Sequence, residues 1–298
     1  MRYPAMEIRE VREDLIEPVK MFLSNRPEFP GPPGWEGLFN YHWTPPRYPY
    51  GYAILDKGLV VAFVGTIFSE RLIAGTKRLC CNLTTWFVEP QYRARMLGPL
   101  LLSRILSIDG LLITSFTPSK VSQALCEKMG FEYLERYELV VPIVPGISSV
   151  GRNHRQKTSI TFNVEEIQHQ LNEHERRILR DHATLPCQHF LVRNGTGAYC
   201  YGIATTTPLG KFRTLKRNWL NLCYLSDPFA FARSFRSLQN QLWTKGRFAL
   251  LRCDARLLPP DFSRIAMRRQ KARQFKSKEP FSATVDNLYS ELITFNKY

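Results

Sequence analysis

The sequence lacks a long apolar run and an apolar start. No stretch of the 298 residues approaches the roughly 18 consecutive apolar residues that a membrane-spanning helix requires. The first residues, Met1-Arg2-Tyr3-Pro4, lead into a charged segment, so no signal peptide is expected. These absences predict a cytoplasmic protein without a transmembrane segment.

Cysteine and histidine are present without the spacing that metal sites require. The seven cysteines are odd in number and form no Cys-x-x-Cys pair, and most lie in apolar runs such as Leu79-Cys80-Cys81. Reduced core cysteines in a reducing compartment are therefore expected. His169, His174 and His182 are not one helical turn apart, which is typical of surface histidines rather than of a helical metal site. No metal is predicted.

Acidic residues are scarce beside basic ones, and familiar catalytic motifs are missing. Asp and Glu number 26 against 41 Lys and Arg, which gives a net charge of +15. This bias favours an anionic ligand or surface, such as nucleic acid, phospholipid, a nucleotide or the phosphates of a coenzyme, and charge alone does not choose among them. Neither a Gly-x-Ser-x-Gly elbow nor a Walker sequence occurs.

The first half of the chain has the pattern of a mixed sheet with helices on its faces. Asp56-Lys57-Gly58 is a hairpin turn, Asp109-Gly110 a second turn, and Gly130 a helix C-cap. The predicted strands are 6–11, 51–56, 59–68, 79–88, 111–116 and 131–141, and the predicted helices are 13–24, 34–42, 97–108 and 119–129.

The second half repeats this order after a linker-like segment at 142–160. The predicted helices are 164–183 and 229–244, and the predicted strands are 187–193, 198–206, 216–225 and 247–253. A hairpin, a long strand, a loop with proline, a helix and a strand follow one another as they do in 51–116. The pattern predicts a duplicated fold of the α/β (α+β) class, with mixed, mostly antiparallel sheets flanked by helices.

The loop between strand 79–88 and helix 97–108 is the strongest candidate for a binding site. A turn that opens a helix directs several unpaired backbone N–H groups to one place, beside the positive end of the helix dipole. Arg93 and Arg95 add positive charge, and Pro99 suits the first helical turn because it needs no N–H there. The segment therefore favours a pyrophosphate.

This segment, Pro90-Gln91-Tyr92-Arg93 followed by an apolar helix, resembles the pyrophosphate loop of the GNAT superfamily of acyl-CoA-dependent N-acyltransferases. A second match, Ser119 to Gly130-Phe131, resembles the helix after that family's fourth core strand. The resemblance implies a domain over 1–145 that binds acetyl-CoA or another acyl-CoA, and a degenerate domain over 146–298. The cofactor-binding residues that it implies are Trp86, Phe87, Val88, Arg93, Ala94, Arg95, Met96, Leu97 and Gly98.

Several positions depart from the family pattern. Its glycines would fall at Ala94, Met96 and Gly98, and only Gly98 is kept. Cys126 stands where the family has a tyrosine acid, so it is either a general acid or a small core residue, and Ser119 stands in place of an asparagine. Strand 79–88 contains no carboxylate as general base.

Three other segments have open interpretations. The proline- and aromatic-rich stretch 25–50 is either a loop packed on its own aromatics or a wall of an acceptor pocket. Loop 226–233 has no glycine, so the second half is expected to bind no coenzyme A. The basic segment 264–278 (Arg264, Arg268, Arg269, Lys271, Arg273, Lys276, Lys278) either binds an anionic acceptor, tRNA or membrane surface, or is a solvated helix face or loop.

Two functions follow from the resemblance. The first is an N-acyltransferase, with acetyl-CoA as the expected donor, that moves an acyl group to an amine of a small-molecule or peptide acceptor by direct attack. The second is a catalytically inactive binding or regulatory protein with the same fold that recognises an anionic partner. Arg93, Gly98 and the Gly130-Phe131 pair favour the enzyme, and the lost glycines favour the second function.

Overall fold

The computed structural model describes residues 6–24, 36–43, 47–73, 75–146, 158–195, 197–210, 217–278 and 285–296. Much of the aromatic-rich stretch 25–50, most of the linker, and residues 279–284 therefore lie outside the described residues. The chain divides into two compact units. Unit 1 comprises Met1–Leu134, Ala272–Val285 and Tyr289–Lys297, and unit 2 comprises Glu135–Lys271, Asp286–Leu288 and Tyr298.

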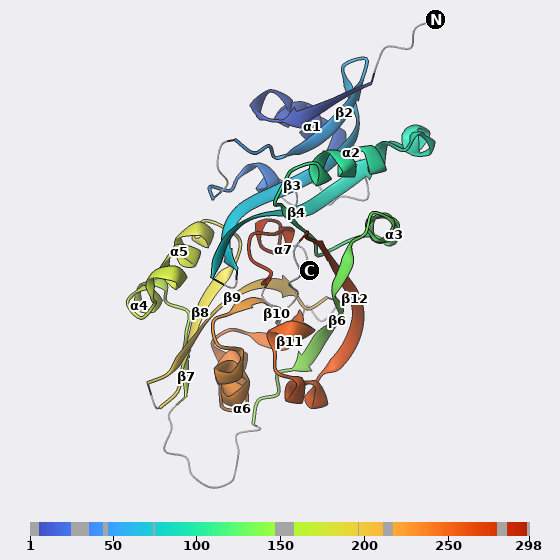
Figure 1. Ribbon diagram of the computed structural model, residues 1–298. Helices are drawn as coiled ribbons and strands as arrows, with labels where there is room; N and C mark the ends of the chain where they lie inside the picture. The colour runs from blue at the N-terminus through green and yellow to red at the C-terminus, as the bar shows by residue number, and fades with distance from the viewer. Residues whose placement is uncertain are drawn as a thin grey trace, which may run out of the picture. The chain divides into compact units, whose positions relative to one another are not determined.

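Unit 1 is built on a mixed sheet with the strand order β1-β2-β3-β4-β5-β12 (Figure 1). Its neighbouring strands are antiparallel, except that β4 and β5 are parallel. The elements are β1 (Glu7–Val11), α1 (Glu13–Ser24), η1 (Glu36–Phe39), β2 (Gly51–Asp56), β3 (Leu59–Ile73), β4 (Thr76–Val88), η2 (Pro90–Arg95), α2 (Leu97–Leu106), β5 (Leu112–Ser115), α3 (Lys120–Lys128), the end of β12 (Met267–Lys276) and α7 (Glu291–Thr294).

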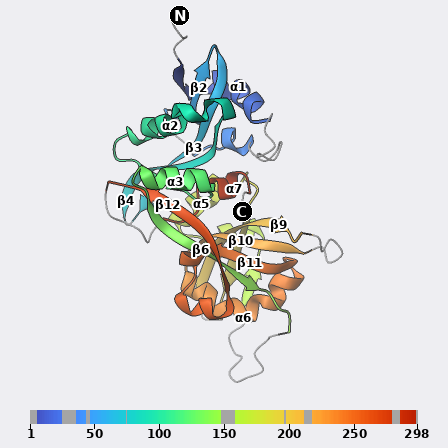
Figure 2. The same ribbon diagram turned by 90° about the vertical axis from the view of Figure 1, so that its right-hand side faces the viewer.

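Helices cover both faces of this sheet (Figure 2). On one face, Leu101, Leu102 and Ile105 of α2 pack with buried side chains of the central strands. On the other face, Leu15 and Val19 of α1 pack with a second cluster that contains Phe63 and Phe87. The predicted helices 13–24 and 97–108 thus pack their apolar sides onto the sheet, although Met21 of α1 is exposed.

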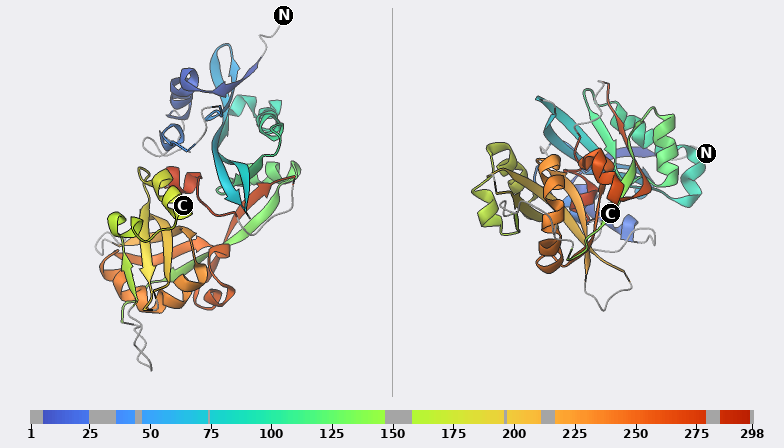
Figure 3. Two further views of the ribbon diagram at one scale, coloured as in Figure 1. Left: turned by 60° about the vertical axis from the view of Figure 1, so that its left-hand side comes forward. Right: turned by 90° about the horizontal axis from the view of Figure 1, so that it is seen from below.

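Unit 2 has the strand order β7-β8-β9-β10-β11-β6, in which only the pair β10-β11 is parallel. The α4–α5 pair and α6 flank its strands (Figure 3). The elements are most of β6 (Glu132–Pro142), β7 (Ser159–Thr161), α4 (Val164–Gln168), α5 (Glu173–His182), β8 (Gln188–Arg193), β9 (Tyr199–Pro208), β10 (Asn218–Leu225), α6 (Pro228–Thr244), β11 (Phe248–Asp254), η4 (Ala255–Leu257), η5 (Pro260–Ile265) and the start of β12.

Two strands, β6 and β12, pair with partners that their order in the sequence does not predict. The strand predicted at 131–141 is present, but its residues Glu138–Pro142 pair with β11 of unit 2. Strand β12 supplies the neighbour of β5 in unit 1, through Gln274–Lys276. The compact units thus divide the chain differently from a single boundary at residue 145. Residues 267–276 of the basic segment form strand β12, so the alternative of a solvated helix face or loop does not describe them.

The single helix predicted over 164–183 is also wrong, because the structure has α4 and α5 with a break between them. Asn172 accepts a hydrogen bond from the backbone N–H of Glu175 at 2.9 Å, and its own N–H donates to the Glu175 carboxylate at 3.1 Å. This reciprocal capping box starts a new helix at Glu173. Among the described helices, none is long and apolar enough to cross a membrane.

Candidate functional site

The parallel strands β4 and β5 diverge soon after they meet. They are paired only where Cys80–Asn82 faces Leu112–Thr114, whereas β4 continues to Val88. On its other side, β4 pairs with β3 at Thr84 and again at Phe87, and it carries one more residue than β3 between these positions. This is a β-bulge, with Thr85 at φ 46°. The backbone of β4 beyond Asn82 therefore has a side that β5 does not occupy.

A short 3₁₀ helix and a left-handed residue link β4 to α2. Met96 ends η2 and begins α2 with φ 57° and ψ 24°. No side chain caps either helix at its N-terminus. The first N–H groups of an α-helix have no partner within the helix, so those of Leu97 and Gly98 stand at the positive end of its dipole.

Side-chain contacts hold this loop in place. The Tyr92 hydroxyl donates to the Asp56 carboxylate at 2.6 Å, and this hydrogen bond raises the pKa of Tyr92. Arg93 Nε donates to the Val88 carbonyl at 3.2 Å, with its guanidinium 5.5 Å from the centre of the Phe87 ring. Arg95 lies 4.9 Å from the Tyr92 ring centre. Side chains of the loop thus bond to the ends of β2 and β4, and its two arginines give it positive charge.

Helix α3 provides the opposite wall. Ser119 is its N-cap, and its hydroxyl oxygen accepts the N–H of Ser122 at 3.2 Å. The Ser122 hydroxyl donates to the Ser119 carbonyl at 3.1 Å. Ser119 therefore has a structural role at the start of α3 and also faces the pocket described next.

A pocket of about 350 Å³ lies between these elements. This volume is near the lower end of the range, roughly 300–1,000 Å³, of small-molecule sites. The lining residues include Arg93 and no acidic side chain; they are Trp86, Phe87, Val88, Arg93, Gly98, Pro99, Ser119, Val121, Ser122 and Leu125. The pocket is thus apolar along β4, lined by both hydroxyl and apolar side chains at α3, and positively charged at η2, just before α2.

Six of the residues named from sequence line this pocket: Trp86, Phe87, Val88, Arg93, Gly98 and Ser119. Ala94, Arg95 and Met96 are exposed on the loop and are not lining residues, and Leu97 is buried in the core. Met96 is 67% exposed and does not fill the turn. The sequence pattern did not identify Pro99, Val121, Ser122 and Leu125, which also line the pocket. The helical spacing of 121, 122 and 125 would have placed the last three on one face of α3.

Cys126 points into the core. It is fully buried in the cluster that contains Leu101 and Phe131, and it is absent from the pocket lining. Burial raises the pKa of its thiol to about 12. The structure supports the alternative that Cys126 is a small packing residue, so we assign no proton transfer to it.

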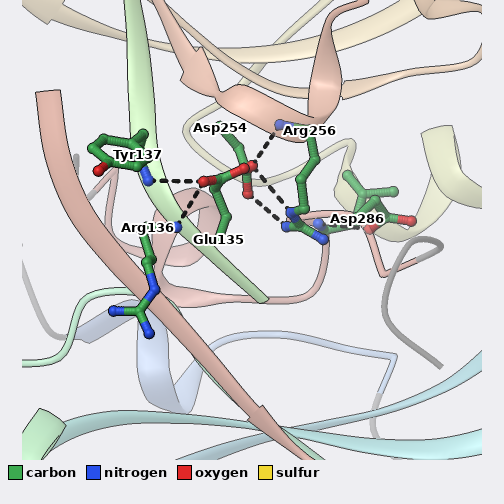
Figure 4. Close-up of polar contacts among 7 residues, drawn as sticks. Glu135, Arg136, Tyr137, Asp254, Arg256 and Asp286 are labelled. Carbon is green, nitrogen blue, oxygen red and sulfur yellow. Dashed lines mark hydrogen bonds and ion pairs between the residues drawn. The ribbon is translucent and has the colours of Figure 1, made fainter. Parts of the chain in front are cut away.

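The parallel pair β10–β11 and helix α6 of unit 2 differ from β4–β5 and α2 of unit 1 in how the helix begins. The Asp227 carboxylate caps α6 and accepts the N–H of Ala230 at 2.8 Å, so a negative charge already occupies the helix N-terminus. At the end of β11, buried Asp254 forms an ion pair with Arg256 at 2.5 Å (Figure 4). Strands β10 and β11 remain paired to Leu222 and Cys253. The Asp227 carboxylate at the start of α6 disfavours the binding of an anion there.

The architecture is similar to that of solved N-acyltransferases. A GCN5-related N-acetyltransferase from Anabaena variabilis ATCC 29413 has a TM-score of 0.57 and 13% identity, over 92% of this chain and 73% of its own. A putative acetyltransferase from Pyrococcus horikoshii has a TM-score of 0.53 and 14% identity, over 97% and 95%. The N-myristoyltransferase of Saccharomyces cerevisiae, solved with bound myristoyl-CoA, has a TM-score of 0.51 and 12% identity, over 96% and 83%.

The chain therefore has the fold of the GCN5-related N-acetyltransferases, the GNAT superfamily, as the sequence motifs implied. No protein-family model matches the sequence, and no curated protein matches it significantly. Within the described residues, no group of three or more His, Cys, Asp or Glu is arranged to hold a metal ion.

Proposed function

We propose that the chain is an acyl-CoA-dependent N-acyltransferase whose donor binds in the pocket of unit 1. The observation that carries the proposal is the coincidence of three features at one place. These are the uncapped start of α2, the Arg93 guanidinium, and the side of β4 that β5 leaves open beyond Asn82. Together they match the parts of an acyl-CoA, a diphosphate joined to an amide-containing arm.

Each part has a chemical role in this proposal. The N–H groups of Leu97 and Gly98 and the charge of Arg93 stabilise the diphosphate. Backbone groups of Trp86–Val88 pair with the amides of the pantetheine arm, which places the thioester where β4 and β5 diverge. The acceptor amine then attacks the carbonyl directly, and the protein contributes mainly by positioning the reactants and polarising the carbonyl.

A bulky side chain in the pocket tests the donor site. Ser122→Trp is expected to fill the pocket and to weaken acetyl-CoA binding at least about tenfold, as measured by calorimetry. Ala124→Trp is the matched control, because Ala124 is exposed on the same helix and does not line the pocket. Equal affinities of the two variants would place the donor elsewhere.

Acyl-CoA binding and thiol release together distinguish an acyltransferase from the second function, an inactive binding protein. An acyltransferase is expected to bind acetyl-CoA or a longer acyl-CoA and to be stabilised against heat by mass action. It should also release the free thiol when primary amines are supplied. Binding without thiol release across a broad set of amines would favour an inactive binding protein. Failure to bind any acyl-CoA would end the enzyme proposal.

A further inference from the structure

A buried carboxylate from the C-terminal segment lies where β4 and β5 begin to diverge. Glu291, the first residue of α7, is fully buried in unit 1. Its backbone N–H donates to the Asn82 side-chain oxygen at 3.3 Å, and Asn82 in turn donates to the Thr114 hydroxyl at 3.2 Å. Asn82 and Thr114 are the last paired positions of the two strands. A carboxylate that β4 itself lacks is thus brought to this place by a distant segment.

The Glu291 carboxylate orients one hydroxyl group. Thr117 Oγ1 donates to Glu291 Oε1 at 2.7 Å. Because the hydroxyl hydrogen is used in this bond, the oxygen lone pairs of Thr117 are left to accept a hydrogen bond from another group. Thr117 is partly exposed, in contrast to Glu291, and it lies two residues before the pocket-lining Ser119.

The segment that carries Glu291 is firmly seated. Leu292 and Ile293 are fully buried. A methyl group placed on Gly37 of η1 would lie 2.1 Å from the Thr294 carbonyl oxygen, so η1 and α7 are in close contact. The Tyr289 ring meets the Trp43 ring edge to face at 5.1 Å. This packing fixes the position of the carboxylate before any ligand binds.

We propose that Thr117 and Glu291 accept the proton of the acceptor amine, so that Thr117 contacts the substrate and Glu291 acts through it. This inference rests on the proposed function. The nitrogen lone pair forms the C–N bond, and the C–S electron pair leaves with the coenzyme A thiolate. The amine proton passes to Thr117 Oγ1 while Thr117 gives its own proton to Glu291. Solvent then returns Glu291 to its starting state and protonates the thiolate, leaving an amide and free coenzyme A.

The pair therefore selects a primary or secondary amine over a hydroxyl or thiol acceptor of the same shape. An amine in the site is a hydrogen-bond donor that gains positive charge as it reacts, and a nearby carboxylate stabilises that charge. What the pair adds to the proposed function is the direction of approach: the amine is presented from the side of the sheet where α7 lies.

Two thioethers of coenzyme A test this inference without a known acceptor. S-(2-aminoethyl)-coenzyme A extends an ammonium group beyond the sulfur, and S-propyl-coenzyme A carries a methyl group at the same position. The wild-type protein is expected to prefer the amino compound by about tenfold at pH 7.5, the usual size of a charge-assisted hydrogen bond. Glu291→Gln and Thr117→Val should abolish the preference without changing the affinity for the propyl compound, and Thr117→Ser should keep it.

The controls distinguish the possible failures. Thr294→Val removes a buried hydroxyl of α7 that donates to the Ser290 carbonyl at 3.1 Å, and it should leave the preference intact. Wild-type protein with no preference, or Glu291→Gln with the full preference, would overturn the inference while leaving the donor site standing. Should neither thioether bind the wild type, the proposed function itself fails. If Glu291→Gln does not fold, the result for Thr117→Val tests the inference. Thr117 is partly exposed, so its substitution is expected to leave the fold intact.

Discussion

At the scale of the residue, Met96 shows how a position can keep its backbone geometry after losing its usual side chain. Its φ of 57° lies in the region that glycine adopts without cost, and the GNAT resemblance places a glycine there. The long side chain is accommodated because it points to solvent. Met96 therefore adopts the left-handed backbone that the loop requires, at some cost in backbone strain.

Replacing Met96 by glycine is expected to stabilise the protein. Met96→Gly should raise the free energy of unfolding by about 1 kcal/mol, because the left-handed backbone no longer meets a Cβ. Met21→Gly is the matched control: Met21 is 64% exposed, similar to the 67% of Met96, but it lies inside α1. Glycine there should lower the free energy of unfolding by about 1 kcal/mol. Urea denaturation measures both, and a loss of stability in Met96→Gly would contradict the argument.

The cysteines differ in how accessible they are. Cys187 is partly exposed, whereas the other six are buried. Burial raises the Cys187 pKa from 9.0 to about 12, so at pH 8 its thiolate is on the order of a thousandfold rarer than that of a free cysteine. N-ethylmaleimide should therefore label Cys187 first in the folded protein, and slowly. Mass spectrometry identifies the site, and fast labelling of Cys126 would show that it is not a core residue.

His189 links the stability of the protein to pH. Burial lowers its pKa from 6.5 to about 4 in the folded protein, where its ring lies 2.7 Å from the Tyr201 hydroxyl. Between these pH values the unfolded chain binds a proton that the folded chain does not, so stability falls as the pH decreases. The loss should reach about 3 kcal/mol.

A pair of variants isolates this effect in urea denaturation at pH 7 and pH 4.5. His189→Gln should show a smaller decrease in stability between the two pH values than the wild type. His174→Gln changes an exposed histidine and should behave as the wild type does. Identical pH dependence in all three proteins would show that His189 titrates normally.

At the level of single helices and strands, nearby residues determine where most elements begin and end. Helix α1 begins and ends where the sequence predicted, and the β2–β3 hairpin turns at Lys57 and Gly58 with φ values of 52° and 80°. Both values are positive, as a tight hairpin turn of this kind requires. The break between α4 and α5 was missed because the hydrophobic pattern continues across it and only the Asn172 cap interrupts the helix.

The close contact between η1 and α7 gives a prediction at this scale. Gly37→Ala is expected to destabilise unit 1 by more than 2 kcal/mol, because the new methyl group meets backbone atoms of Thr294 that are not free to move away. Gly75→Ala is the control. It lies in a turn at φ 78° with nothing near the added methyl group, so only backbone strain, about 1 kcal/mol, is expected. Thermal unfolding compares the two, and equal losses would mean that α7 is loosely held.

At the scale of the whole molecule, the origin of the last strand in each sheet was not predictable. The local pattern of 131–141 and of 267–276 is compatible with a strand at any open sheet edge. Which edge each one covers depends on contacts between residues far apart in the sequence, such as Gln274 with Ser115 and Glu138 with Asp254. Covering the open edges of β5 and β11 removes unpaired backbone groups that would otherwise remain exposed.

The segments that form the pocket of unit 1 could be identified from the sequence. The strand, the loop with Arg93 and Gly98, and helix α3 are contiguous in the chain, so their order and spacing restrict where the pocket can form. The contact between Thr117 and Glu291 depends on the folded arrangement of the chain. Glu291 reaches Thr117 across 174 positions of sequence, and neither residue belongs to a pattern that predicts the other. Local propensities act over a few residues, whereas this contact depends on how the C-terminal segment packs against the completed sheet.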